Sequence, residues 1–208
     1  LCTALILLIK KPSMSVMDLL EVIPGPDFPT GGVIVDELNT RIENYETGRG
    51  SFRIRSYYKV EQLSRGLWQL VVTEIPFQVQ KSKLVEKIAE LINDKKISGL
   101  VDIRDESDEN IRLILEPRVK TVDPDVLMER LFQNSDLETK FSLNMNVLID
   151  GLTPKVCSLK DTLLAYLNHR KDVLRRRSKF RLINIDLRLE ILEGYLVAFV
   201  NLDRVIEI

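Results

Sequence analysis

The hydrophobic pattern changes period within one stretch, residues 67–92. Over residues 67–75 apolar side chains return at every second position, as they do on one face of a β-strand. Pro76 ends that strand because it has no backbone N–H to donate to a neighbour. Over residues 84–92 the apolar positions return every third or fourth residue, which predicts a helix, and Ser82 is expected to cap it. The apolar face of such a helix has to lie on a sheet, so the sequence predicts helix packed on sheet.

Shorter elements are predicted on both sides of this centre. Helices are expected at residues 1–10, 16–22, 38–47 and from Pro124, where Asp123 can cap the first turn. Strands are expected at residues 33–35, 52–60, 100–103, 111–115, 141–148 and 155–158. A turn at residues 62–66, and another at Asp150 and Gly151, would join neighbouring strands as hairpins. The predicted fold class is therefore an α+β or α/β domain with antiparallel hairpins packed on helices.

The last fifty residues follow a different period. Apolar residues recur at sevens, namely at Leu159, Tyr166, Val173, Phe180 and Leu187. This spacing predicts one long helix with a coiled-coil stripe, continuing at least to Gly194. No other predicted helix is long enough to cover the stripe, so its partner is expected from a later part of the protein or from a second subunit. We accordingly divide the chain into a domain at residues 1–158 and a truncated coiled-coil stalk at residues 159–208.

Composition and charge refine this division. The chain has 208 residues, 45% of them hydrophobic, and a net charge of −1, which suits one core with an appendage. The stalk carries ten Lys or Arg against seven Asp or Glu, or +3, and the remainder of the chain is therefore −4. Cys2 and Cys157 lie in unlike contexts and are expected to be a reduced cytoplasmic pair. No apolar run is long enough to span a membrane, and the non-Met start within an apolar run predicts a fragment of a longer protein.

Two groups of basic residues are candidates for binding nucleic acid. In the predicted strand, Arg53, Arg55 and Lys59 share one face, and Arg49 lies in the preceding turn. Such a face suits a phosphate backbone, although an ordinary solvated sheet face has the same pattern. In the predicted long helix, seven of the twelve residues from 170 to 181 are basic, and they include Arg170, Lys171, Arg175, Arg176 and Arg177. This second cluster fits either a DNA or RNA contact or a soluble coiled-coil surface.

Motifs for catalysis are missing from the sequence. It contains no P-loop, no GxSxG elbow, no HExxH and no cysteine pair at zinc spacing. The single histidine, His169, falls inside the long helix, and the acidic run RDESDEN at residues 104–110 is interpreted as a solvated hairpin tip. We therefore assign no catalytic, cofactor-binding or metal-binding residue to this chain.

Five motifs taken together resemble a known family. They are GPDFPTGG at 25–32, TGRGSFRIR at 47–55, VTEIPFQVQKSKLVEKIAELINDKKI at 72–97, IRDESDE at 103–109 and LEGYLVAFVNLDRVIEI at 192–208. In this order they resemble the A subunits of bacterial type IIA DNA topoisomerases. The arginines at 175–177, VLIDGLTPKV at 147–156 and VAFVNLDRVIEI at 197–208 resemble the topoisomerase IV branch of the family more than the DNA gyrase branch.

The resemblance implies a place within a larger enzyme. The family passes one DNA duplex through a double-strand break in another, using a tyrosine in an Arg-Tyr-Thr-Glu context that no tyrosine of this chain shares. The nucleophile is therefore expected upstream of Leu1, and this chain is expected to be the inactive tower domain and the start of the coiled coil. Mg²⁺ and ATP would act through the B subunit of topoisomerase IV, in an A2B2 enzyme containing a homodimer of A subunits.

The resemblance also implies a DNA-holding role for this segment. Double-stranded DNA is the expected partner, gripped beside the gate through positioning contacts that have little sequence preference. The implied location is cytoplasmic and nucleoid-associated. A free-standing nucleic-acid-binding module is one alternative interpretation of the same basic residues. A purely structural coiled-coil scaffold is another, but it would leave the cationic strand face unexplained.

Overall fold

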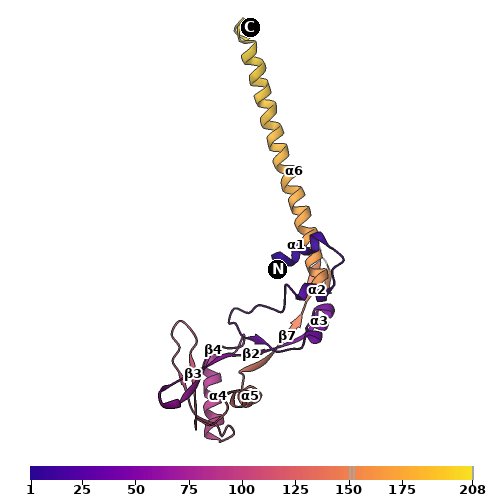
Figure 1. The fold of residues 1–208 in the computed structure, drawn as a ribbon. Coiled ribbons are helices and arrows are strands. Elements are labelled where there is room, and N and C mark those ends of the chain that lie inside the picture. Colours follow the sequence, from indigo (N-terminus) through magenta and orange to yellow (C-terminus); the bar gives the residue numbers. More distant parts are fainter. Residues whose placement is uncertain (150, 152, 208) are drawn as a thin grey trace.

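The computed structural model describes residues 1–149, 151 and 153–207, without the side chains of Arg65 and Val205. Figure 1 shows an elongated molecule in which one long helix, α6, projects from a body of sheets and shorter helices. The predicted α+β domain followed by a long helix is confirmed. The α-helices are α1 Cys2–Lys10, α2 Val16–Leu20, α3 Leu38–Thr47, α4 Lys81–Asn93, α5 Pro124–Asn134, α6 Leu159–Val200 and α7 Leu202–Ile206.

The strands form three antiparallel groups. Their bounds are β1 Val33–Ile34, β2 Arg49–Arg55, β3 Tyr57–Gln62, β4 Trp68–Glu74, β5 Leu100–Asp105, β6 Leu113–Pro117, β7 Glu138–Asn144, β8 Asn146–Ile149 and β9 Thr153–Val156. The first sheet has the order β1-β2-β7, the second has the order β3-β4-β6-β5, and β8 pairs with β9. In Figure 1 the second sheet lies at the end of the body away from α6, and β2 and β7 run between it and helices α1 to α3.

The second sheet and its helices enclose the larger apolar core. The central strand β4 is buried at every position from Trp68 to Val72, so both of its faces are covered. The predicted stripe of α4 packs on this sheet, with Leu84 and Ile88 fully buried. Helix α5 adds Leu131 and begins as predicted, with the Asp123 carboxylate accepting from the backbone N–H of Asp125 and Val126.

A second, smaller core roots the long helix in the body. Leu159 and Leu163, in the first turns of α6, pack with Leu8 of α1, Leu19 of α2 and Phe52 of β2. Ser158 caps α6 by accepting from the backbone N–H of Asp161. Farther along, the heptad positions Phe180 and Leu187 are exposed, so pairing of this stripe with another helix stays a prediction. No helix in the described residues is both long and apolar enough to cross a membrane.

The strand predicted over residues 52–60 is wrong, because the chain changes sheets at Ser56. The backbone N–H of Ser56 donates to the carbonyl of Leu137, which separates β2 in the first sheet from β3 in the second. The predicted apolar face therefore holds only in part: Phe52 and Ile54 are buried, but Val60 is exposed. Period alone could not show the break, since the even positions stay apolar or aromatic on both sides of it.

Two smaller predictions also need correction. Helix α4 begins at Lys81 after a turn at Pro76–Val79, so Gln80 and not Ser82 is its N-cap. The strand predicted over residues 141–148 is two strands, β7 and β8, because Met145 bonds instead to the carbonyl of Gly48. The β8–β9 hairpin forms as predicted, although Asp150 of its predicted turn lies outside the described residues.

Candidate nucleic-acid interface

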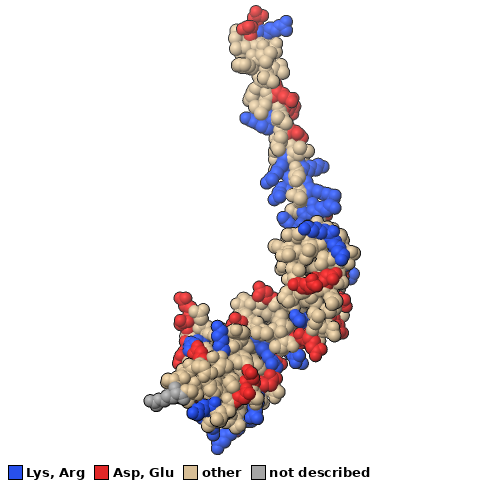
Figure 2. Space-filling model, in the orientation of Figure 1, with Lys and Arg blue, Asp and Glu red and all other residues tan. Residues whose placement is uncertain are grey.

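The basic residues of α6 stand on an exposed part of the helix. Figure 2 shows Lys and Arg side chains on both sides of α6 where it leaves the body. Twelve residues span about 17 Å of helix and more than three turns, so seven charges at these positions surround it. Among the described residues, the cluster makes a single ion pair, from Arg175 to Asp172 at 3.8 Å, and the Arg175 side chain is 70% exposed. Such a pair contributes little, so the cluster keeps nearly its full positive charge.

The strand arginines, by contrast, are neutralised within the fold. The Arg53 guanidinium lies 3.1 Å from the Asp36 carboxylate, which also accepts from the Arg53 backbone N–H at 2.7 Å. Arg55 donates to Glu138 on β7 and, through both terminal nitrogens, to Glu129 on α5. Its guanidinium carbon also lies 4.5 Å from the centre of the Phe132 ring. Their contact with DNA stays a prediction, since it would compete with these internal partners.

The pKa of Arg55 follows from the same contacts. Burial alone would lower the pKa of the guanidinium, but the hydrogen bonds to Glu138 and Glu129 outweigh it and the pKa is raised. Arg55 therefore stays charged as a tie between β2, β7 and α5.

Arg49 and Lys59 have no carboxylate partner in the described part of the chain, but the structure separates them. Arg49 begins β2, close to the base of α6, because Gly48 lies against the carbonyl of Cys157. Lys59 lies on β3 in the other sheet, 5.9 Å from the centre of the Tyr57 ring. Arg49 was predicted in the turn before the strand, but it belongs to the strand itself. The four predicted basic residues do not form one surface, because Lys59 lies in the other sheet.

Strand β7 brings in polar residues that sequence reasoning missed. Its register places Lys140 directly opposite Arg53 and Ser142 opposite Ser51. Lys140, Ser142 and Asn144 are all exposed. Residue 53 and residue 140 are far apart in the sequence, so only the strand pairing could reveal that they are neighbours.

The acidic hairpin tip at residues 104–110 is mostly exposed, as predicted, and two of its carboxylates, Asp105 and Glu106, lie in ion pairs. Lys81 lies 2.8 Å from Asp105, and Arg112 contacts both Glu61 and Glu106. The hydrogen bond from Lys81, with help from Ser107, lowers the pKa of Asp105 to about 2. Within the described ranges, no group of three or more His, Cys, Asp or Glu residues is arranged to hold a metal ion.

The tyrosines with shifted pKa values are poorly suited to nucleophilic attack. Burial raises the pKa of Tyr45 to about 12. Burial, followed by the hydrogen bond to Asp125, raises the pKa of Tyr58 to about 12 as well. A hydroxyl with a raised pKa stays protonated, and a protonated hydroxyl is a weak nucleophile.

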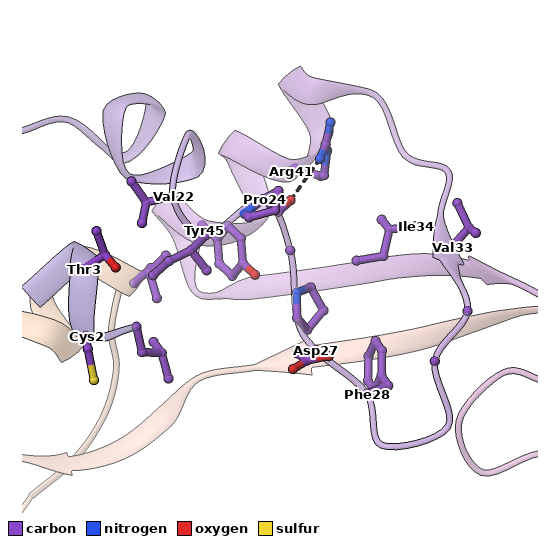
Figure 3. A pocket seen from close by; sticks show the side chains of 17 residues that line it. Cys2, Thr3, Val22, Pro24, Asp27, Phe28, Val33, Ile34, Arg41 and Tyr45 are labelled. Atoms are coloured by element: carbon purple, nitrogen blue, oxygen red, sulfur yellow. Dashed lines mark hydrogen bonds between the residues drawn. The ribbon is translucent and has the colours of Figure 1, made fainter. Parts of the chain in front are cut away.

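An open cleft of 1090 Å³ lies between α1, α3 and the GPDFPTGG loop. Figure 3 shows Tyr45, Ile34 and Phe28 around it, and Arg41 donating to the carbonyl of Pro24 at 2.9 Å. Its lining is mostly apolar, and Asp27 is the one acid among the residues that line it.

Comparison with known proteins agrees with this arrangement. The family model for the A subunit of DNA gyrase/topoisomerase IV matches residues 1–208. The DNA topoisomerase 4 A subunit of Caulobacter vibrioides is 54% identical over 202 residues, which is 97% of this chain and 27% of that protein. The protein of the same name from Rickettsia bellii is 49% identical over 208 residues, 100% of this chain and 28% of its own length. The DNA gyrase A subunit of Halalkalibacterium halodurans is 46% identical over 200 residues, 96% of this chain and 24% of that protein.

The match along the whole chain shows which class of protein this is, and the long basic helix is consistent with it. The chain belongs to the family of DNA gyrase and topoisomerase IV A subunits, and the resemblance inferred from the five motifs is confirmed. Of these three relatives, the two topoisomerase 4 A subunits share a larger fraction of residues with the chain than the gyrase A subunit does. The chain spans about a quarter of the length of these relatives.

Proposed function

We propose that this chain is the tower and first stalk helix of a topoisomerase IV A subunit, with residues 1–158 as the tower and residues 159–208 as the stalk. In this role it holds the flanks of a bent DNA duplex while bond breakage occurs elsewhere in the enzyme. The parent would be an ATP-dependent isomerase that passes one duplex through another, using Mg²⁺ and ATP bound by the B subunit in an A2B2 assembly. Its place would be the bacterial cytoplasm, on the nucleoid.

The observation that carries the proposal is the dense group of exposed, unpaired cations on α6. In the body, several basic side chains form ion pairs with carboxylates, as Arg53 does with Asp36 and Arg112 with Glu61. On α6, Arg170, Lys171, Arg176 and Arg177 have no such partner in the described residues, and all are exposed. Unpaired cations on a projecting helix release counterions from DNA when they meet phosphates. Arg49 and Lys59 are available for the same role.

A salt titration of DNA binding tests this role. The chain and a variant with Arg175, Arg176 and Arg177 all replaced by Gln would be titrated with a long duplex at several salt concentrations. Each phosphate contact contributes a slope of about −0.9 in log K against log salt, so losing three contacts should reduce the slope by roughly 2–3. The matched control replaces Lys83, Lys95 and Lys120 by Gln, the same change of charge on exposed residues of the body.

Two results are decisive. The proposal predicts a weaker and less salt-dependent complex for the α6 variant and an unchanged slope for the control. Equal slopes for the wild type and the α6 variant would refute the assigned role of this helix. Shuffled duplexes of the same length should bind alike, because contacts to phosphate carry no sequence information.

A further inference from the structure

The outward face of the β2–β7 ladder is a second exposed polar surface. The two strands pair over seven positions, from Arg49 opposite Asn144 to Arg55 opposite Glu138. Alternate residues point to opposite faces of a sheet. Phe52 and Ile54 are buried on one face, so the residues that alternate with them point outward. The outward set is Arg49, Ser51, Arg53 and Arg55 on β2, with Glu138, Lys140, Ser142 and Asn144 on β7.

Charges on this face are arranged unevenly. Arg53 and Lys140 are directly opposed, and like charges in that position repel each other. Asp36 approaches Arg53 from beyond β1 and neutralises it, with its own carboxylate only 6% exposed. Lys140 has no carboxylate partner in the described part of the chain and is exposed. One of the two opposed cations is therefore satisfied and the other is left for an external anion.

The neighbours of Lys140 favour a phosphate as that anion. Toward the base of α6 the face continues through Ser142, Ser51, Asn144 and Arg49, which supply hydroxyl, amide and guanidinium donors and no carboxylate. Toward the other end, Glu138 and the nearby Glu129 are engaged by Arg55. DNA phosphates accept hydrogen bonds from side chains such as those of Ser, Asn, Lys and Arg, whereas carboxylates repel phosphates.

We infer that Lys140, with Ser142, Asn144, Ser51 and Arg49, forms a phosphate-contact strip for duplex DNA, and that this strip stops at the Arg55–Glu138 pair. The inference rests on the proposed function, which makes DNA the partner, and it adds β7 to the contact surface. Lys140 is the principal cation of the strip. Arg55 stays with its carboxylates and takes no part in the contact.

The test compares single variants of the 208-residue chain bound to a duplex of about 30 base pairs. Lys140→Gln should weaken binding several-fold and reduce the salt slope by roughly one, because one phosphate contact is lost. Lys83→Gln on α4 is the matched control and should bind like the wild type. Lys140→Arg keeps the charge and should restore binding. The melting temperature of Lys140→Gln should not fall, because the variant removes a like-charge opposition to Arg53.

The outcomes separate this inference from the proposed function. If Lys140→Gln binds like the wild type while the triple variant of α6 loses affinity, the strip is refuted and the role of α6 stands. If Lys140→Arg loses as much affinity as Lys140→Gln, charge at residue 140 is not the cause and the strip is again refuted. A second variant, Ser142→Glu, places a carboxylate within the strip and should weaken binding more than Ser82→Glu does on α4.

Discussion

Replacing Arg55 by Met should lower the unfolding free energy of the protein without changing its affinity for DNA. Arg55 contacts Glu138 of β7, Glu129 of α5 and the Phe132 ring together. Its side chain is 26% exposed, and those of Glu138 and Glu129 are 20% and 50% exposed. Met preserves the apolar stem and removes the charge, so the variant isolates the electrostatic contribution.

The magnitude follows from these exposures. The half-exposed contact with Glu129 contributes little, as surface ion pairs do. The contact with Glu138 is more buried, and removing Arg55 leaves that carboxylate without its charged donor. Together with the lost contact to Phe132, the expected loss of unfolding free energy is about 2–3 kcal/mol. For a chain of this length that corresponds to a melting temperature lower by roughly 5–10 °C.

The assay is thermal unfolding followed by circular dichroism, beside a DNA salt titration. Arg49→Gln serves as the control for the unfolding measurement only, because Arg49 is exposed and has no ion pair in the described residues. It should unfold within about 0.5 kcal/mol of the wild type. Arg55→Met should keep the salt slope of the wild type. If Arg55→Met melts with the wild type and lowers the salt slope by about one, Arg55 is a DNA contact and the assignment of its carboxylates as structural partners is wrong.

Three further predictions concern other parts of the molecule. The hydrogen bonds from Arg112 and Gln69 lower the pKa of Glu61 from 4.5 to about 2, so Glu61 stabilises the fold above pH 4.5 and loses this effect as the pH falls toward 2. The difference in unfolding free energy between the wild type and Glu61→Gln, measured by urea unfolding, should therefore shrink over that range. A constant difference would contradict the pairing. Gly31→Ala should lower the unfolding free energy by about 1–3 kcal/mol more than Gly66→Ala in the same measurement. Both glycines have positive φ, but a Cβ at Gly31 would overlap the Glu74 carboxylate, which accepts from the backbone N–H of Gly32, whereas nothing lies within 4 Å of a Cβ at Gly66. Equal losses would show that the loop can move to accept the methyl group. The proposed function further predicts that, in a complete enzyme assembled with a B subunit, the triple Gln variant at 175–177 should still cleave DNA at saturating concentration but pass strands more slowly at low concentration. Loss of cleavage at saturation would place chemistry in this helix.

Local signals in the sequence predicted most of the elements. Asp123 before Pro124 marks the start of α5, and the heptads from Leu159 predict α6, because caps and periodic apolar positions act within a few residues of each other. The exposure of the 170–181 cluster could also be anticipated, since a helix with charges on all sides cannot be buried.

Long-range pairing could not be predicted in the same way. The partners of Arg55 are 74 and 83 positions away in the sequence, and the neighbour of Arg53 on β7 is set by strand register. The change from the first sheet to the second at Ser56 depends on a hydrogen bond from its backbone N–H to the carbonyl of Leu137, and no local pattern predicts that bond. The sequence therefore identified which residues are cationic, and the fold decides which of them are already paired.

Footprinting of lysines on a DNA complex would show which faces of the chain hold the duplex. The chain would be acetylated with and without a long duplex at low salt, and the reactivity of each lysine measured by mass spectrometry. We expect protection of Lys171 and Lys179 on α6 and of Lys140 on β7, with Lys83 and Lys95 in the body unchanged. Equal protection of all five lysines, or protection of Lys83 and Lys95 alone, would contradict a DNA-holding surface formed by α6 and the β2–β7 face.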